Sequence, residues 1–176
     1  MFNLGRYVAC IAEGSAETAI IDILLDADLL IFNREKLLDG EVLHCRSAKV
    51  FEGRYLRKGF DDRITVFRIL DSRREQFKLS KAYEHKVDVV NVITAPEIEM
   101  LIILNEGKYI QFKKSGKKPS EFCKSVLRLK DVKSYDFVSS YFSNPDVLLC
   151  AMKQYKEKSR LQRGESSLID LLKYTV

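Results

Sequence analysis

Residues 7–17 read YVACIAEGSAE, and this stretch decides the expected fold. Its first part, Tyr7–Ala12, is apolar without polar alternation, which is typical of a strand buried on both faces of a parallel sheet. Gly14 and Ser15 end the strand. The next residues, 16–25, place their apolar side chains on one helical stripe, with Ser15 as the expected N-cap. A buried strand followed at once by an amphipathic helix indicates an α/β fold.

The same alternation continues as far as residue 95. Strand-like runs occupy residues 42–46 (VLHCR), Ile64–Leu70 (ITVFRIL) and Val87–Ile93 (VDVVNVI), and residues 48–58 and 77–86 have helical patterns between them. Strands separated by helices imply right-handed βαβ units. We therefore expect a Rossmann-like, mainly parallel four-stranded sheet, flanked by helices, over residues 1–106.

Helical patterns dominate the rest of the chain. They cover residues 97–105, 120–129, 135–142, 145–158 and 167–174. Pro119 suits the first turn of the second of these helices. Residues 107–176 are therefore expected to form a basic helical extension packed on the sheet domain.

The formal net charge of +5 is unevenly distributed along the sequence. Residues 1–107 carry a net charge of −3 and residues 108–176 carry +8, and residues 108–133 alone hold 9 basic and 2 acidic side chains. An acidic-leaning part beside a basic patch is common in proteins that handle a polyanion. The plain alternative is a lysine-rich, solvated surface.

Length and composition exclude several classes of protein. A chain of 176 residues with 46% hydrophobic side chains can bury a core, and it resembles neither a disordered chain nor a disulfide scaffold. No apolar stretch reaches the roughly 18 residues that span a bilayer, and the first residues lack a signal-peptide pattern. We expect a cytoplasmic protein without a membrane role, whose four cysteines stay reduced.

A carboxylate follows three of the predicted strands. Glu13 follows the first strand, Asp71 follows the third, and Glu97 and Glu99 come after the fourth. Open parallel sheets bind ligands at the carboxyl ends of their strands, so converging carboxylates would form an oxygen-rich site suited to Mg²⁺ or Mn²⁺. Glu17 adds a carboxylate on the first turn of the first helix, where an acid also simply complements the helix dipole.

Short motifs accompany these carboxylates. Residues 13–17 read Glu-Gly-x-x-Glu (EGSAE), residues 71–73 read DSR, and residues 95–104 read APEIEMLIIL. In this order the motifs resemble the Toprim fold of topoisomerases, bacterial primases and OLD-type nucleases. The last stretch is similar to the Asn-Pro-x-Phe-Glu-x-Trp-Leu-Leu stretch of RloB-like Toprim proteins, which are small proteins linked to restriction and phage-defence loci. The resemblance covers roughly residues 5–105.

The resemblance implies a Toprim-like nuclease or phosphotransfer protein that acts on DNA or RNA with Mg²⁺ or Mn²⁺. Glu13 would be a general acid or base or a metal ligand, Asp71 would hold the metal, and Glu17 and Glu99 would be further ligands. Arg73 stands where the family has a second aspartate, and an arginine suits a phosphate but no metal. The alternative is a non-catalytic subunit with a degenerate Toprim site that binds nucleic acid or docks a partner, such as an ATPase or another defence-locus protein.

Basic side chains supply the expected contacts to nucleic acid. They are Arg73, Arg74, Lys108, Lys113, Lys114, Lys117 and Lys118. The five lysines lie in the segment KYIQFKKSGKKP (residues 108–119), where they would neutralise phosphates. Tyr109 and Phe112 in the same segment either stack on unpaired bases or belong to the core.

Overall fold

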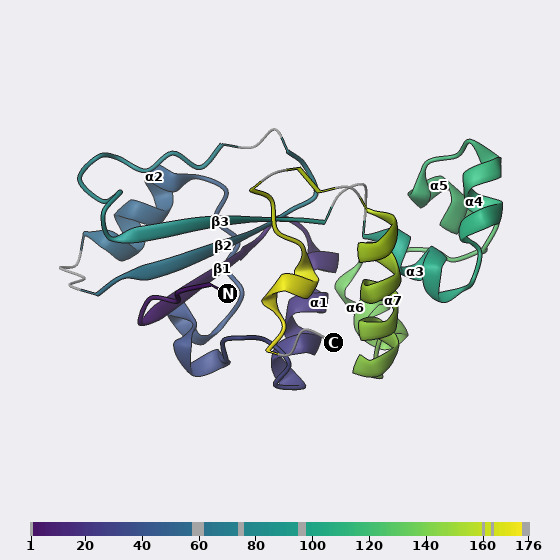
Figure 1. Ribbon diagram of the computed structural model, residues 1–176, viewed down its shortest axis with the longest axis horizontal. Helices are drawn as coiled ribbons and strands as arrows, with labels where there is room; N and C mark the ends of the chain where they lie inside the picture. Colours follow the sequence, from purple (N-terminus) through teal and green to yellow (C-terminus); the bar gives the residue numbers. More distant parts are fainter. Residues whose placement is uncertain are drawn as a thin grey trace.

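A parallel sheet of three strands forms the centre of the protein (Figure 1). The computed structural model describes residues 2–57, 62–73, 76–94, 98–159, 161–162 and 164–173. Strands β1 (Tyr7–Ala12), β2 (Ile64–Leu70) and β3 (Val87–Ile93) lie in the order β1-β2-β3, all parallel. Their carboxyl ends therefore meet at one edge of the sheet, which we call the carboxyl edge, and the expected α/β class is confirmed.

Every side chain of β2 is buried because apolar clusters cover both faces of the sheet. On one face, Phe67 and Ile69 join a large cluster with helix α1 (Ser15–Asp26). On the other face, Ile64 and Val66 belong to a smaller cluster. Successive strand residues point to opposite faces, so a strand between two cores is apolar at most positions. In β2 only Thr65 and Arg68 are polar, and both are buried.

Helix α1 forms as expected, but its N-cap differs from the prediction. Gly14 is the N-cap, with an extended backbone and no side-chain cap, and Ser15 is the first helical residue. The Thr18 backbone N–H and hydroxyl both donate to the Gly14 carbonyl, at 3.1 and 2.9 Å.

The predicted fourth strand, at residues 42–46, is wrong. Of these residues only Leu43 pairs with β1, through a parallel bridge with Ile11 in which the Leu43 N–H donates to the Cys10 carbonyl at 2.7 Å. Two 3₁₀ turns, Arg34–Lys36 and Leu38–Gly40, precede the bridge, and α2 (Ala48–Phe51) follows closely. The chain between these turns and α2 thus touches β1 at one point instead of running along it.

Two of the helices predicted between strands also differ. A π-helical turn, Glu52–Leu56, continues α2, and Lys58 lies outside the described residues. Residues 77–86 form no helix: residues 76–80 have no regular structure and turns follow. Here Phe77 is half-buried and Leu79 is buried in the smaller core cluster, so alternate residues face the core, as in an extended chain.

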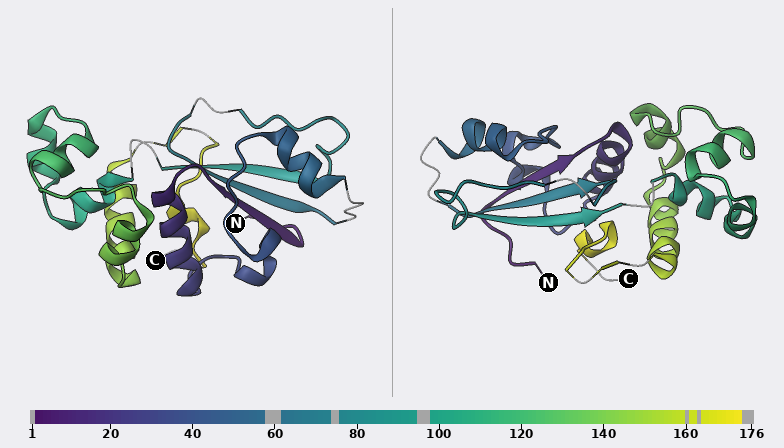
Figure 2. Two further views of the ribbon diagram at one scale, coloured as in Figure 1. Left: turned by 180° about the vertical axis from the view of Figure 1, so that it is seen from behind. Right: turned by 90° about the horizontal axis from the view of Figure 1, so that it is seen from above.

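The second part of the chain is mainly helical, as expected, but it includes a helix over residues 109–115 that the sequence pattern did not predict. It contains α3 (Glu99–Asn105), α4 (Tyr109–Ser115), α5 (Pro119–Ser125), α6 (Tyr135–Tyr141) and α7 (Pro145–Lys158). Helix α3 packs against α5 and α7, and α6 packs against α1. Figures 1 and 2 show α4 and α5 at one end of the long axis, with α3 between them and the sheet. The large core cluster continues through these helices, so they share one core with the sheet.

After α7 the chain returns to the sheet. The predicted helix at residues 167–174 is a single 3₁₀ turn, Leu168–Leu171, which begins with a capping box between Ser167 and Asp170. Just before it, Ser166 forms a parallel bridge with Val92 on the outer edge of β3, and Leu172 bridges Leu30. This returning segment therefore covers part of β3, at the end near the carboxyl edge.

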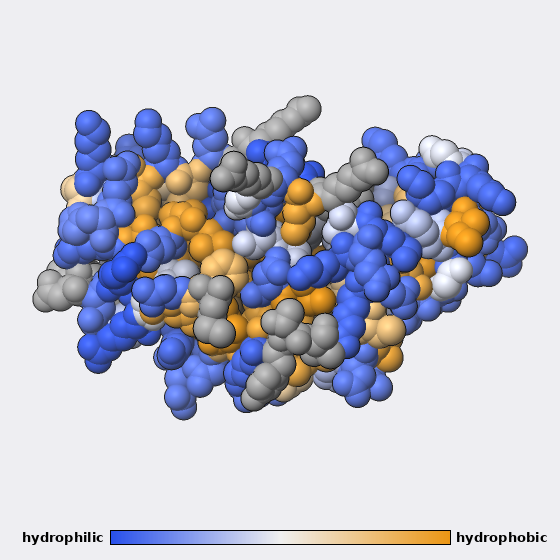
Figure 3. Space-filling view, in the orientation of Figure 1, coloured by the Kyte–Doolittle hydropathy of each residue, from blue (hydrophilic) through white to orange (hydrophobic). Residues whose placement is uncertain are grey.

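On the face shown in Figure 3, apolar side chains gather over the sheet, and hydrophilic side chains cover most of the rest, including most of the end formed by α4 and α5. Within the ranges that the structure describes, no helix combines the length and the apolar character needed to cross a membrane.

Candidate functional site

Glu13 and Asp71 lie side by side at the carboxyl edge. Glu13 follows β1 and Asp71 follows β2, and the parallel register pairs Ala12 with Ile69. The Glu13 Oε2 atom accepts a hydrogen bond from the Asp71 backbone N–H at 3.3 Å. The Asp71 side chain is exposed, and Glu13 is half-buried. The Glu13 carboxylate thus lies against the backbone of Asp71, whose side chain is open to solvent at the same edge.

Gly14 makes room for a third carboxylate at this edge. A Cβ atom on Gly14 would lie 2.5 Å from the Glu17 Oε2 atom. The Glu17 side chain is only 7% exposed and lies in the first turn of α1. A side chain at position 14 would therefore displace the Glu17 carboxylate, whereas the extended backbone of Gly14 is one that any residue adopts.

Burial raises the pKa of Glu17 above its ordinary value. A hydrogen bond from its own backbone N–H lowers this pKa, the charge of Asp71 raises it, and the charge of Lys133 lowers it. The net shift is upward, so ionised Glu17 is held in an unfavourable environment. Unfavourably placed ionisable groups of this kind cluster at functional sites.

Replacing Glu17 with glutamine should stabilise the protein at neutral pH. Because the folded-state pKa is raised, the unfolded chain loses its proton first as pH rises, and ionisation then favours unfolding. We expect Glu17→Gln to gain about 1 kcal/mol at pH 7, or about 2–4 °C in Tm, and to gain little near pH 4, where wild-type Glu17 is largely protonated in both states. Thermal melts from pH 4 to 7 measure this, with exposed Glu84→Gln as the control. Equal gains for both variants would contradict the prediction.

Glu99 lies nearby in a different setting from the one expected. It is the first residue of α3 and is fully buried, and its Oε1 atom lies 3.2 Å from the Lys133 Nζ. This carboxylate already forms an ion pair with a lysine, so the structure does not place it as a metal ligand. Lys133 lies 34 residues after Glu99, and no local sequence pattern predicts the contact between the two residues.

Arg46 is a cation at the carboxyl edge that the sequence motifs did not indicate. Its Nη2 atom donates to the Glu13 backbone carbonyl at 3.4 Å. The available signal was its place at the end of the strand-like run 42–46, which meets β1 at Leu43.

Arg73 is held by the returning C-terminal segment. Its guanidinium donates two hydrogen bonds to the Glu165 carboxylate, at 2.6 and 3.1 Å. This contact lowers the pKa of Glu165 and raises that of Arg73. A carboxylate thus occupies the fork that the sequence analysis assigned to a phosphate. Its neighbours Arg74 and Glu75 lie outside the described residues, as does Glu97.

The lysine segment lies away from the sheet, on α4 and the turn to α5 (Figure 1). Lys108, Lys113, Lys114 and Lys118 are exposed, whereas Lys117 forms an ion pair with Glu121 at 2.9 Å. The structure thus presents four of these five cations to solvent.

The aromatic residues of this segment face the core. The Phe112 ring packs edge-on against buried Phe122, with ring centroids 5.5 Å apart. Tyr109 is half-buried against the large cluster, and the Lys158 Nζ lies 5.4 Å from its ring centroid. The rings of Tyr109 and Phe112 therefore fit a role in the core better than a role in stacking on bases.

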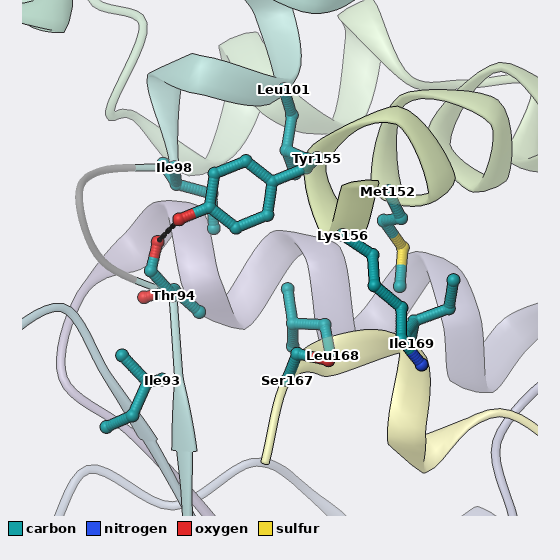
Figure 4. A pocket seen from close by; sticks show the side chains of 10 residues that line it. All are labelled: Ile93, Thr94, Ile98, Leu101, Met152, Tyr155, Lys156, Ser167, Leu168 and Ile169. Atoms are coloured by element: carbon teal, nitrogen blue, oxygen red, sulfur yellow. Dashed lines mark hydrogen bonds between the residues drawn. The ribbon is translucent and has the colours of Figure 1, made fainter. Parts of the chain in front are cut away.

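A small cavity behind the end of β3 is a separate feature (Figure 4). Its volume is about 20 Å³, and apolar side chains of α3, α7 and the last 3₁₀ turn form most of its wall. The Tyr155 hydroxyl donates to the Thr94 carbonyl at 3.3 Å beside it. A space of this size holds about one water molecule, so it is no substrate site.

A metal at the carboxyl edge would depend on Glu13 and Asp71. Across the described ranges, no three His, Cys, Asp or Glu side chains stand close enough together to enclose a metal ion. Mg²⁺ commonly binds proteins through one or two carboxylates and keeps several water ligands. The pair of Glu13 and exposed Asp71 fits that donor set, whereas Glu99 does not join it.

Comparison with known proteins adds no family assignment. No family model matches the chain, and no significant match was found among curated proteins or solved structures.

Proposed function

We propose that the protein is a Toprim-like, Mg²⁺- or Mn²⁺-dependent nuclease that hydrolyses phosphodiester bonds in DNA or RNA. The observation that supports this best is the contact between the Glu13 carboxylate and the Asp71 backbone at the carboxyl ends of two parallel strands. In open parallel sheets this edge is where ligands bind. The resemblance described above extends the proposal to a cytoplasmic role in phage defence or repair, with an ATPase or other defence-locus partner.

In the proposed reaction Glu13 acts both as a ligand and as the base, whereas Asp71 acts as a ligand. Asp71, with Glu13, would hold the ion, which supplies positive charge that polarises the phosphodiester and favours ionisation of water. Glu13 takes the proton of the attacking water as the oxygen bonds to phosphorus. The bond from phosphorus to the leaving oxygen breaks, and solvent protonates that oxygen. Glu17, placed over Gly14, adds negative potential that helps to retain a cation beside Asp71.

The neighbouring cations would bind the polyanion. Arg46 lies beside Glu13, and the exposed lysines of α4 lie at the end of the molecule. Lysine side chains neutralise phosphates and release counterions, which favours binding without sequence preference. A strand reaching from the carboxyl edge to α4 would contact both groups.

Substitution of the paired carboxylates tests the proposal. With labelled single-stranded DNA, double-stranded DNA and RNA, we expect wild-type cleavage that requires Mg²⁺ or Mn²⁺. Asp71→Asn and Glu13→Gln should each lower the rate by about a hundredfold or more, because each removes a charge that acts in the transition state. Asp136→Asn, at an exposed position on α6, is the control and should cleave as the wild type does.

Absence of metal-dependent cleavage on every substrate would overturn the enzyme proposal. The second candidate is then a non-catalytic nucleic-acid-binding subunit, which the exposed lysines of α4 and the Lys133–Glu99 ion pair favour. That candidate predicts salt-sensitive binding that is the same in the wild type and in Asp71→Asn.

A further inference from the structure

A groove with a basic lining lies between α3, α5 and the loop of residues 126–134. Its volume is about 550 Å³, and it is open to solvent. Three lysines, Lys124, Lys130 and Lys133, line it together with Ser120 and two acidic residues, buried Glu99 and exposed Asp131. It is separate from the exposed face of α4 that carries the lysines described above.

The loop that carries Lys130 has an unusual backbone. Arg128 and Asp131, on either side of Lys130, have φ angles of 59° and 55°, which lie in the left-handed region. For residues other than glycine this conformation costs about 1–2 kcal/mol, and it is enriched at functional sites. Hydrogen bonds hold the loop in place: the Leu129 N–H donates to the Cys123 carbonyl, and the Ser134 N–H donates to the Asp131 carbonyl.

Two lysines of the groove keep their charge available. Lys124 and Lys130 are exposed, and no carboxylate within the described ranges forms an ion pair with either. Lys117 and Lys133, by contrast, contact Glu121 and Glu99. Lysine ammonium groups beside a hydroxyl, here that of Ser120, form a suitable environment for a phosphate group.

Lys133 connects the groove with the carboxyl edge. Its Nζ contacts Glu99 on the side of the groove, and its charge lowers the pKa of Glu17. Glu17 in turn senses the charge of Asp71. Lys133 therefore contributes positive charge both to the groove and to the carboxyl edge.

We propose that this groove binds the backbone phosphates of a nucleic acid strand next to the phosphodiester held at Glu13 and Asp71. The inference rests on the proposed function for its substrate class. The contacts would be to phosphate groups and not to base edges, so binding should be insensitive to sequence.

Anisotropy of a fluorescein-labelled single-stranded DNA, measured against the full chain, tests the groove. Lys124→Ala/Lys130→Ala should weaken binding at least tenfold and reduce the slope of log K against log salt by about 1.4, the value for two lost contacts on a single strand. The matched control is Lys49→Ala/Lys78→Ala, which removes the same charge from exposed positions on and near α2. It should change the affinity less than twofold.

Unchanged affinity in Lys124→Ala/Lys130→Ala, or an equal loss of affinity in the control, would overturn the proposal that the groove binds phosphates. Binding of inorganic phosphate, but not of the DNA, would assign the groove to a free anion and also overturn the proposal. Cleavage assays separate this result from the proposed function. If binding depends on the groove but no cleavage occurs, the groove proposal stands and the nuclease proposal fails. If cleavage needs Asp71 but not Lys124 and Lys130, the nuclease proposal stands and the groove proposal fails.

Discussion

Replacing Lys133 with methionine should lower the free energy of unfolding at pH 7 by about 3 kcal/mol. The Lys133 Nζ lies 3.2 Å from a carboxylate whose residue, Glu99, is fully buried. Removing one partner of such a pair leaves the other charge in an environment of low polarity, which costs about 3–5 kcal/mol for a fully buried pair. We expect the low end of that range because the Lys133 side chain is 55% exposed.

Urea denaturation followed by circular dichroism measures this loss. Lys130→Met is the matched control, since it removes an exposed lysine from the same loop. The double variant Glu99→Gln/Lys133→Met should regain part of the lost stability, because it leaves no buried charge at this position. A Lys133→Met protein as stable as Lys130→Met would show that the ion pair contributes nothing.

Phe67→Ala should cost about 3–5 kcal/mol of stability, the range for removing a large aromatic side chain from a core. Phe67 is fully buried in the central strand. Its ring stacks on Phe32 with centroids 5.4 Å apart and meets Phe2 edge-on at 5.3 Å. The substitution therefore removes ring contacts that help to join the N-terminal residues and the loop after α1 to the sheet.

Denaturation curves distinguish this cavity effect from a general sensitivity to substitution. Phe67→Leu keeps much of the volume and should lose clearly less than Phe67→Ala. Val50→Ala, at a side chain that is 60% exposed on α2, should stay within about 0.5 kcal/mol of wild type. A loss below about 1 kcal/mol for Phe67→Ala would contradict the packing described here.

Local patterns in the sequence predicted the three strands, α1 and α7 well, because these elements are long and strongly periodic. The same reasoning failed at residues 42–46 and 77–86. An apolar run such as VLHCR has the pattern of a strand, but a strand must also pair along its length with a neighbour. After the 3₁₀ turns that precede this run, only Leu43 of it lies where it can pair with β1. In the second segment the alternation of Phe77 and Leu79 matches an extended chain and not the helical period that residues 77–86 also fit.

The carboxyl edge was predictable in part. Parallel strands end together, so the meeting of Glu13 and Asp71 followed from assigning β1 and β2 correctly. The ionic partners were not predictable, because contacts such as Lys133 with Glu99 and Arg73 with Glu165 join residues 34 and 92 positions apart. Such pairs depend on how the helices pack, and one sequence carries no local sign of that.

The bridge between Val92 and Ser166 bears on the order in which the chain folds. Its partners are 74 positions apart, with five helices between them. Closing so long a loop costs entropy before the contact is gained, and distant contacts of this kind slow folding. The carboxyl end of β3, next to the proposed site, is therefore expected to be completed late in folding, after the intervening helices have formed.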